Sequence, residues 1–211
     1  MRYLTFALTK GRLASKTLEL LERLGITCDE MKDKDSRKLI FVNEELKLKF
    51  FLAKGPDVPT YVEYGAADIG VVGKDTLLEG DKDYYEMLDL GIGKCKFIVA
   101  GLPENNLFDK VGHVKIGTKY PNIAKAYFLE KGMDVELIKI DGSVELAPIL
   151  GLCDGIVDIM ETGTTLKENG LVGFDTVCDI SARVIVNKAS FKLKKDEITQ
   201  ILNDLKSVME D

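Results

Sequence analysis

Several residue types are scarce in this chain, and each scarcity excludes a kind of chemistry. The 211 residues contain one histidine, His113, and no tryptophan. A zinc site built mainly from histidines is therefore excluded, and a Ser-His-Asp triad would depend on His113 alone. Because His113 lies between the polar residues 109–110 and an expected strand at residues 114–117, we interpret it as a surface histidine.

The cysteines are few and widely separated. None of the four forms a CxxC pair, and the chain starts with a strand pattern where a secretory signal would stand. We therefore expect reduced, largely buried thiols at Cys28, Cys95, Cys153 and Cys178.

Long apolar runs and an excess of positive charge are also lacking. No run approaches the roughly 20 residues that span a bilayer. The net charge is −6, from 29 basic and 35 acidic residues, which argues against a broad nucleic-acid surface. We expect a cytoplasmic protein that binds neither nucleic acid nor membrane. A polyanionic ligand must then be met by local basic residues and backbone amides.

Strand and helix patterns alternate along most of the chain, which predicts α/β sheets with parallel strands. The glycines at 91 and 93 are interpreted as a hinge, and strands resume after residue 176. We therefore predict two lobes crossed twice by the chain, with ligands in the cleft between them at loops that follow strands. Lobe I comprises residues 1–92 and 182–211, and lobe II comprises residues 93–181.

One stretch of the second lobe carries the strongest chemical signal. A buried strand at residues 156–160 is followed by a loop of small and hydroxyl residues and by a helix that starts at Leu166. The loop N–H groups, the helix dipole and the threonine hydroxyls favour a phosphate. The phosphate-binding candidates are Thr162, Gly163, Thr164 and Thr165. The alternative is a plain strand-to-helix turn with a threonine cap.

Two carboxylates at the mouth of this loop refine the prediction. Asp158 and Glu161 would repel a bare phosphate, but they suit a ligand that carries hydroxyls or a Mg²⁺ ion beside its phosphate. Ribose 5-phosphate offers this combination. Acids followed by Thr-Gly-x-Thr resemble the diphosphoribosyl-binding loop of phosphoribosyltransferases.

A second candidate anion site follows the first strand of the chain. Lys10, Gly11 and Arg12 form a glycine turn with two basic residues before a leucine-rich helix. The spacing is not that of a Walker A loop. The alternative is a capped turn with solvated charges.

Five stretches together resemble the ATP phosphoribosyltransferase family, and they keep the family order along nearly the whole chain. They are TKGRL (residues 9–13), DVPTYVE with GAADIG (57–63 and 65–70), GKD (73–75), GSVELAP (142–148) and ETGTTLKENGL (161–171). The resemblance implies two lobes like those of type II periplasmic binding proteins, each a mostly parallel sheet flanked by helices, with the active site in the cleft. It also implies a Mg²⁺-dependent attack of ATP N1 on C1 of phosphoribosyl diphosphate, the first step of histidine biosynthesis.

The length of the chain adds an expectation about partners. The long form of the family has a further histidine-sensing domain, and this chain ends after the last predicted helix at residues 194–209. It therefore resembles the short form. For that form the resemblance implies a homodimer within a hetero-oligomer and a regulatory subunit similar to histidyl-tRNA synthetase.

Further residues receive roles from the resemblance combined with their charge. Lys10, Arg37 and Lys54 are catalytic candidates for neutralising phosphate charge, and Lys54 stands where the family commonly has an arginine. Solvated loop charges are the alternative for Arg37 and Lys54. The candidates for the nucleotide are Gly11, Arg12, Asp68, Gly70 and Glu145, where Asp68 could instead cap a turn and Glu145 could cap a helix.

Two other functions fit parts of the pattern. A solute-binding or sensor protein of the same two-lobed fold needs only an anion cradle and a hinge. A non-catalytic subunit would leave the chemistry to its partner. The acid pair beside the complete threonine loop argues against both.

Overall fold

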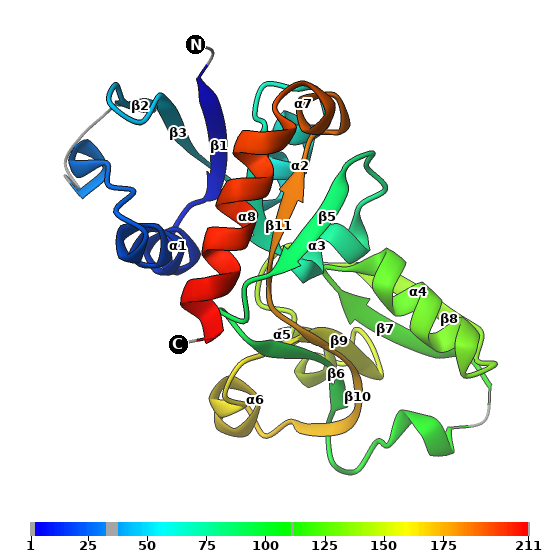
Figure 1. Cartoon of the computed structure of the whole chain (residues 1–211). Coiled ribbons are helices and arrows are strands. Elements are labelled where there is room, and N and C mark those ends of the chain that lie inside the picture. The colour runs from blue at the N-terminus through cyan, green and yellow to red at the C-terminus, as the bar shows by residue number, and fades with distance from the viewer. Residues whose placement is uncertain (1–2, 33–37, 111, 211) are drawn as a thin grey trace. The chain divides into compact units, whose positions relative to one another are not determined.

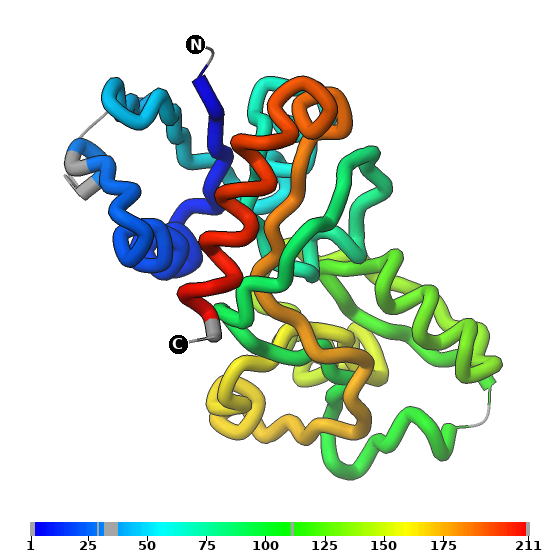
Figure 2. The backbone as a smooth tube through the Cα atoms, viewed as in Figure 1, coloured from blue at the N-terminus to red at the C-terminus, as the bar shows by residue number. Residues whose placement is uncertain are grey.

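The chain forms two compact units in this computed structural model, which describes residues 3–32, 38–110 and 112–210 (Figure 1). The first unit is Met1–Gly93 with Ser181–Asp211, and the second is Lys94–Ile180. The backbone passes into the second unit after Gly93, in green, and returns at Ser181, in orange (Figure 2). The second unit is thus a continuous insertion into the first.

The first unit is built on a six-stranded sheet with the order β2-β3-β1-β4-β11-β5. Its strands are β1 (Leu4–Thr9), β2 (Ile40–Asn43), β3 (Leu48–Ala53), β4 (Ile69–Gly73), β5 (Tyr85–Asp89) and β11 (Ala182–Val186). Its α-helices are α1 (Arg12–Arg23), α2 (Val58–Glu63), α3 (Lys74–Glu79), α7 (Lys188–Leu193) and α8 (Lys195–Glu210).

Alternation along β1 divides the core of the first unit between the two faces of the sheet. Phe6 and Leu8 pack in one cluster with residues of α1 and α8, such as Leu21 and Ile198. Ala7 packs in a second cluster with Val58 and Val62 of α2. Because successive side chains of a strand point to opposite faces, helices cover the sheet on both sides. The central strands are therefore open to ligands only at their ends.

The second unit is built on a five-stranded sheet with the order β10-β6-β9-β7-β8. Its strands are β6 (Cys95–Gly101), β7 (Val114–Thr118), β8 (Val135–Lys139), β9 (Gly155–Met160) and β10 (Val172–Ile180). Its α-helices are α4 (Pro121–Glu130), α5 (Leu146–Ile149) and α6 (Thr164–Glu168). Phe128 of α4 packs on one face of the sheet, and Ala147 of α5 and Leu166 of α6 pack on the other.

The predicted two-sheet α/β organisation is confirmed, but both sheets are mixed where we expected mostly parallel ones. In the first unit only β3-β1 and β1-β4 are parallel, and in the second only β9-β7 and β7-β8. A short turn joins the antiparallel neighbours β2 and β3. Parallel neighbours need a longer crossover, usually a helix, and this connection lacks one.

The return of the chain to the first unit is fixed by one carboxylate. Asp89 Oδ1 accepts hydrogen bonds from Ser181 Oγ at 2.6 Å and from the backbone N–H of Gly91 at 2.9 Å. Arg183 Nη2 lies 2.9 Å from Asp89 Oδ2. The segments on both sides of the insertion therefore bind the same side chain.

Asp68 and Gly70 do not lie where the sequence prediction put them, at the cleft end of a strand. β4 begins at Ile69, so both residues belong to its amino end. Asp68 is buried, and its Oδ2 accepts hydrogen bonds from Thr5 N–H at 2.8 Å and Lys194 Nζ at 2.7 Å. The apolar run from residue 66 hid this boundary, and the role of Asp68 is structural.

Gly70 is required by packing. A Cβ atom built on it would lie 2.7 Å from Val62 Cγ2 and 2.9 Å from Val58 Cγ1, both on α2. It would also lie 3.0 Å from Ile185 Cγ1 on β11. The absence of a side chain lets α2 approach the sheet, so we withdraw the nucleotide-binding role of Gly70.

The replacement Gly70→Ala should therefore lower the free energy of unfolding by about 1–3 kcal/mol, because the added methyl overpacks the contact between α2 and β4. Gly55→Ala is a matched control in the same unit, since its Cβ would meet side-chain atoms at 3.5 Å or more. Denaturant titration of both variants measures the difference. Equal losses would contradict the packing argument.

Candidate functional site

The predicted phosphate loop joins β9 to α6 in the second unit. Gly163 stands directly before the helix with φ 79° and ψ 0°, a left-handed conformation that favours glycine. Thr162 Oγ1 lies 3.0 Å from Thr164 Oγ1 and accepts a 3.4 Å hydrogen bond from Thr164 N–H. Leu166 is buried and anchors the helix, whereas Thr162, Thr164 and Thr165 are exposed. The threonine hydroxyls therefore gather at the open end of α6.

The backbone adds donors at the same place. The first N–H groups of a helix have no acceptor within the helix, and they carry its positive end charge. In α6 these groups belong to the residues that directly follow Gly163. Hydroxyl and backbone donors thus face one small, exposed region, which suits the oxygens of a phosphate monoester.

Asp158 lies inside β9, three residues before Glu161, and its carboxyl group is unusual. Burial raises the pKa of Asp158 to about 6, and the charge of Glu145 adds to the shift. A hydrogen bond from the backbone of Ile159 and the charge of Lys119 oppose it. The carboxyl group therefore changes its charge near neutral pH. Such a group near a predicted ligand loop is a candidate for ligand contact.

The two charged groups that act on Asp158 lie in segments that follow the neighbouring strands. Thr118 at the end of β7 is in register with Val157 of β9 and Lys139 of β8, and all three strands are parallel. Lys119 follows β7 directly, and Glu145 is the cap residue before α5. The carboxyl ends of these strands thus bring Lys119 and Asp158 to one edge of the sheet.

Lys119 was missed in the sequence analysis. It stands beside no motif, and the only signal for it is its place directly after the strand at residues 114–118. This position indicates a place beside Asp158 only once β9 is known to be the neighbour of β7.

The first unit has a comparable edge with basic residues. Thr9 of β1 and Ala53 of β3 are in parallel register, and Lys10 and Lys54 follow them. Lys10 N–H donates to Ala53 O at 2.9 Å, and both lysine side chains are exposed. Gly11 caps α1 with φ 93°, and Arg12 opens that helix. The structure therefore brings the predicted candidates Lys10 and Lys54 to one edge of the sheet.

Two further predictions concern single residues. Arg37 lies outside the described residues. His113 is exposed, and its Nε2 lies 2.6 Å from Glu136 Oε2, which agrees with the interpretation as a surface histidine. Of the four cysteines, Cys153 is buried and the other three are half-buried, so the expectation of largely buried cysteines holds only for Cys153.

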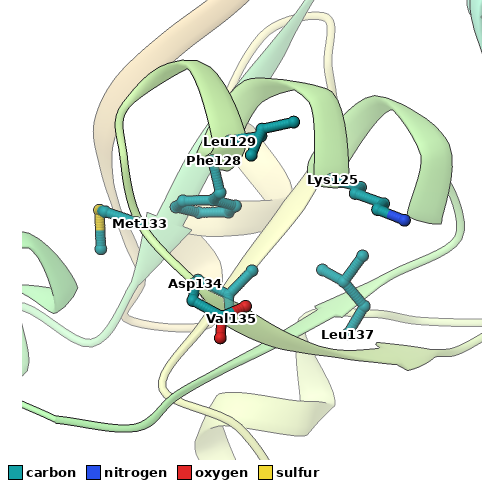
Figure 3. Close-up of a pocket in the computed structure, with 7 residues that line it drawn as sticks. All are labelled: Lys125, Phe128, Leu129, Met133, Asp134, Val135 and Leu137. Carbon is teal, nitrogen blue, oxygen red and sulfur yellow. The ribbon is translucent and has the colours of Figure 1, made fainter.

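A pocket of about 290 Å³ lies elsewhere in the second unit, between α4 and β8 (Figure 3). It is lined by Lys125, Phe128, Leu129, Met133, Asp134, Val135 and Leu137. Val135 begins β8, so the pocket reaches the amino end of a strand whose carboxyl end faces the Asp158 edge. Its lining is mostly apolar and offers little to a phosphate.

No group of three or more metal-binding side chains occurs within the described ranges. In the same ranges no helix is long and apolar enough to cross a membrane. Asp158 and Glu161 could supply one or two carboxylate oxygens, which fits a hard divalent cation held mainly by substrate phosphates and water.

Comparison with a solved structure of low sequence identity shows the fold. The chain aligns with the periplasmic aliphatic sulphonate binding protein SsuA from Escherichia coli with a TM-score of 0.62 at 12% identity, over 99% of this chain and 73% of that one. At this identity the likeness shows a shared two-sheet α/β fold, as predicted, and nothing about the ligand.

Comparison of sequences defines the family. A family model described as HisG, ATP phosphoribosyltransferase, matches residues 54–207. The chain is 60% identical to the ATP phosphoribosyltransferase of Lachnoclostridium phytofermentans, over 99% of this chain and 98% of the relative. It is 61% identical to that of Clostridium acetobutylicum, over 97% and 94%. The chain belongs to the ATP phosphoribosyltransferase family.

A solved structure of the same family agrees with this assignment. The chain aligns with the ATP phosphoribosyl transferase (HisG:HisZ) complex from Thermotoga maritima with a TM-score of 0.83 at 35% identity. The alignment covers 98% of each chain.

The raised pKa of Asp158 predicts how stability depends on pH. The folded protein holds the proton of Asp158 between pH 3.8 and about 6, whereas the unfolded chain releases it. The stability from the protonated form is therefore complete below pH 3.8 and is lost as the pH rises through 6. The free energy of unfolding of Asp158→Asn, minus that of the parent, should therefore rise by about 2 kcal/mol from pH 4 to pH 8. Denaturant titration at each pH measures this difference.

Asp175→Asn provides a comparison of opposite sign. Hydrogen bonds from Tyr127 and Lys131 lower the pKa of Asp175 to about 2. The stability from this carboxylate is present above pH 3.8 and is lost as the pH falls toward 2, so the variant should be weaker than the parent at pH 8. A pH-independent effect of Asp158→Asn would contradict the assignment.

Proposed function

We propose that this chain catalyses the attack of ATP N1 on C1 of 5-phosphoribosyl 1-diphosphate. The products are N1-(5-phosphoribosyl)-ATP and diphosphate, and the reaction is the first step of histidine biosynthesis. The observation that carries the proposal is the identity of 60% with an ATP phosphoribosyltransferase along nearly the whole chain. The loop after β9 supplies the donor groups that a sugar phosphate needs.

The reaction requires positioning and charge stabilisation more than a protein nucleophile. The N1 lone pair forms the new bond to C1, and the C1–O bond breaks with its electrons on the departing diphosphate. An oxocarbenium-like sugar and a more negative leaving group develop along this path, and oriented donors lower its barrier. A chain with one exposed histidine can therefore perform it.

The second unit is assigned to the phosphoribosyl group. The 5-phosphate accepts hydrogen bonds from the backbone and hydroxyls of Thr162, Gly163, Thr164 and Thr165. Asp158 and Glu161 accept hydrogen bonds from the ribose 2′- and 3′-hydroxyls or contact a metal ion. The open end of α6 and the burial of Asp158 support this division, because one is rich in donors and the other offers acceptor oxygens.

The basic edge of the first unit is assigned to the phosphates of ATP or to the diphosphate. Lys10 and Lys54 are proposed to neutralise this charge, with Gly11 and Arg12 at the start of α1 contributing to nucleotide binding. The parallel ends of β1 and β3, where both lysines lie, support the assignment. Arg37 keeps its proposed role as a further cation, and Glu145 remains the candidate nucleotide contact of the second unit.

The family uses a divalent metal, and we assign Mg²⁺ to this role. The metal would screen the phosphate charges of the donor, and Asp158 and Glu161 are the residues that could touch it. We also place the protein in the cytoplasm, because both substrates are highly charged metabolites.

A second protein chain is proposed as a regulatory partner. The Thermotoga maritima relative was solved as a HisG:HisZ complex, and this chain matches 98% of the aligned chain in that structure. We propose that this chain belongs to the short form, forms a homodimer and joins a hetero-oligomer with a subunit similar to histidyl-tRNA synthetase.

The test of the function is diphosphate release from ATP, phosphoribosyl diphosphate and Mg²⁺. The chain alone should form the adduct, and a candidate regulatory subunit should increase the rate. Mass spectrometry of the product identifies N1-(5-phosphoribosyl)-ATP. Donor binding without any adduct, with and without the partner, would point to a different acceptor and overturn the proposed reaction.

The loop assignment is tested by Thr165→Ala and Gly163→Val. The first removes a hydroxyl donor, and the second places a branched side chain where the backbone has φ 79°. Each should weaken binding of phosphoribosyl diphosphate, by roughly 1.5–3 kcal/mol for one lost charge-assisted contact. Calorimetric titration gives the affinities, with the exposed Thr176→Ala as the control. Unchanged affinity in both loop variants would refute the assignment.

A further inference from the structure

The loop at α6 accounts for one of the two anionic groups of the proposed donor. Phosphoribosyl diphosphate carries its second anion at C1, on the opposite side of the ribose ring from the 5-phosphate. The charge of Glu145 acts on Asp158, and Glu161 follows Asp158 by three residues in the chain, so acidic residues dominate this part of the second unit. A diphosphate beside three carboxylates would be repelled unless a cation or metal ion lies near C1.

Lys119 is the cation that stands next to Asp158 at this edge of the sheet. It directly follows Thr118, the β7 residue in register with Val157, and Asp158 directly follows Val157. Thr118 is buried and its Oγ1 donates to Val157 O at 2.7 Å, so the ends of the two strands are tied together. Neighbouring strands lie about 4.8 Å apart, which places the backbones of Lys119 and Asp158 side by side.

The side chain of Lys119 is available to a ligand. It is exposed, and its Nζ lies 5.8 Å from the ring centroid of Tyr120. Within the described residues no carboxylate oxygen lies at ion-pair distance from this ammonium group. Two other lysines of the unit are ion-paired, since Lys110 binds Asp154 at 2.6 Å and Lys131 binds Asp175 at 2.9 Å.

The sheet order gives the edge a direction. From β9 the chain passes through α6 to β10, and α6 contacts β10. In the order β10-β6-β9-β7-β8, α6 therefore lies on the β6 side of β9, whereas Lys119 lies on the β7 side. Asp158 stands between them. A ribose whose hydroxyls bind Asp158 and whose 5-phosphate binds the loop directs C1 away from α6.

We propose that Lys119 binds the 1-diphosphate of the phosphoribosyl donor and stabilises it as the leaving group. This inference rests on the proposed function and assigns a role in it to a residue of the second unit. When the C1–O bond breaks, its electron pair passes to the diphosphate oxygen, and the ammonium of Lys119 meets the added negative charge. The acids then bind the hydroxyls of the sugar, and the lysine binds the group that departs.

Two ligands separate this role from a merely structural one. Phosphoribosyl diphosphate and ribose 5-phosphate share the sugar and the 5-phosphate, and only the first carries the 1-diphosphate. Lys119→Met should weaken phosphoribosyl diphosphate roughly tenfold to a hundredfold, the cost of one charge-assisted contact, and leave ribose 5-phosphate unchanged. Calorimetric titration of the full chain at constant Mg²⁺ measures both affinities.

The controls isolate the charge of Lys119. Titration at pH 8 lies well above the pKa of about 6 for Asp158, so the ionisation of that carboxyl cannot account for a difference. Lys119→Arg should recover most of the affinity, because it restores a cation at the same place. Lys125→Met removes an exposed lysine on α4 of the same unit and should affect neither ligand.

Each outcome is decisive. Selective loss of phosphoribosyl diphosphate binding supports the inference. Equal weakening of both ligands, or no change in either, overturns it and leaves the proposed function standing. Failure of the parent protein to bind either ligand would instead refute the proposed function itself, and the role of Lys119 with it.

Discussion

Both units depend on one constraint, which is that helices cover the two faces of each central sheet. Phe6 and Ala7 of β1 pack into clusters on opposite sides of the first sheet, and Val99 and Ile98 of β6 do the same in the second. Polar groups can therefore reach a ligand only where strands end. In the first unit Lys10 and Lys54 directly follow strands, and in the second Lys119 directly follows β7, next to Asp158 just beyond the residues of β9 that pair with β7.

Local patterns predicted much of the fold and of the candidate site. The loop at Gly163 follows its strand in sequence, so the pattern alone placed its donors together. The pair Lys10 and Lys54 was proposed from charge and resemblance, and the register of Thr9 with Ala53 brings the two residues to one edge.

The remaining features depend on contacts between distant parts of the chain. Lys119 lies beside Asp158 only because β7 pairs with β9, and the sequence around Lys119 does not predict that pairing. Asp68 was misplaced because an apolar run does not show where pairing begins, whereas its partner Lys194 lies 126 residues away. The prediction of mostly parallel strands was wrong for the same reason. β11 pairs with β4 and β5, from which the whole second unit separates it in the sequence.

The insertion of the second unit also orders the events of synthesis. Residues 94–180 are complete before β11 leaves the ribosome, so the second sheet can close while the first is unfinished. Until then β4 and β5 have no common neighbour, and two strand edges of the first unit stay open. β11 is therefore the strand that completes the first sheet. A nascent chain that stalls before residue 182 would contain a complete second unit and an incomplete first unit that is prone to aggregation.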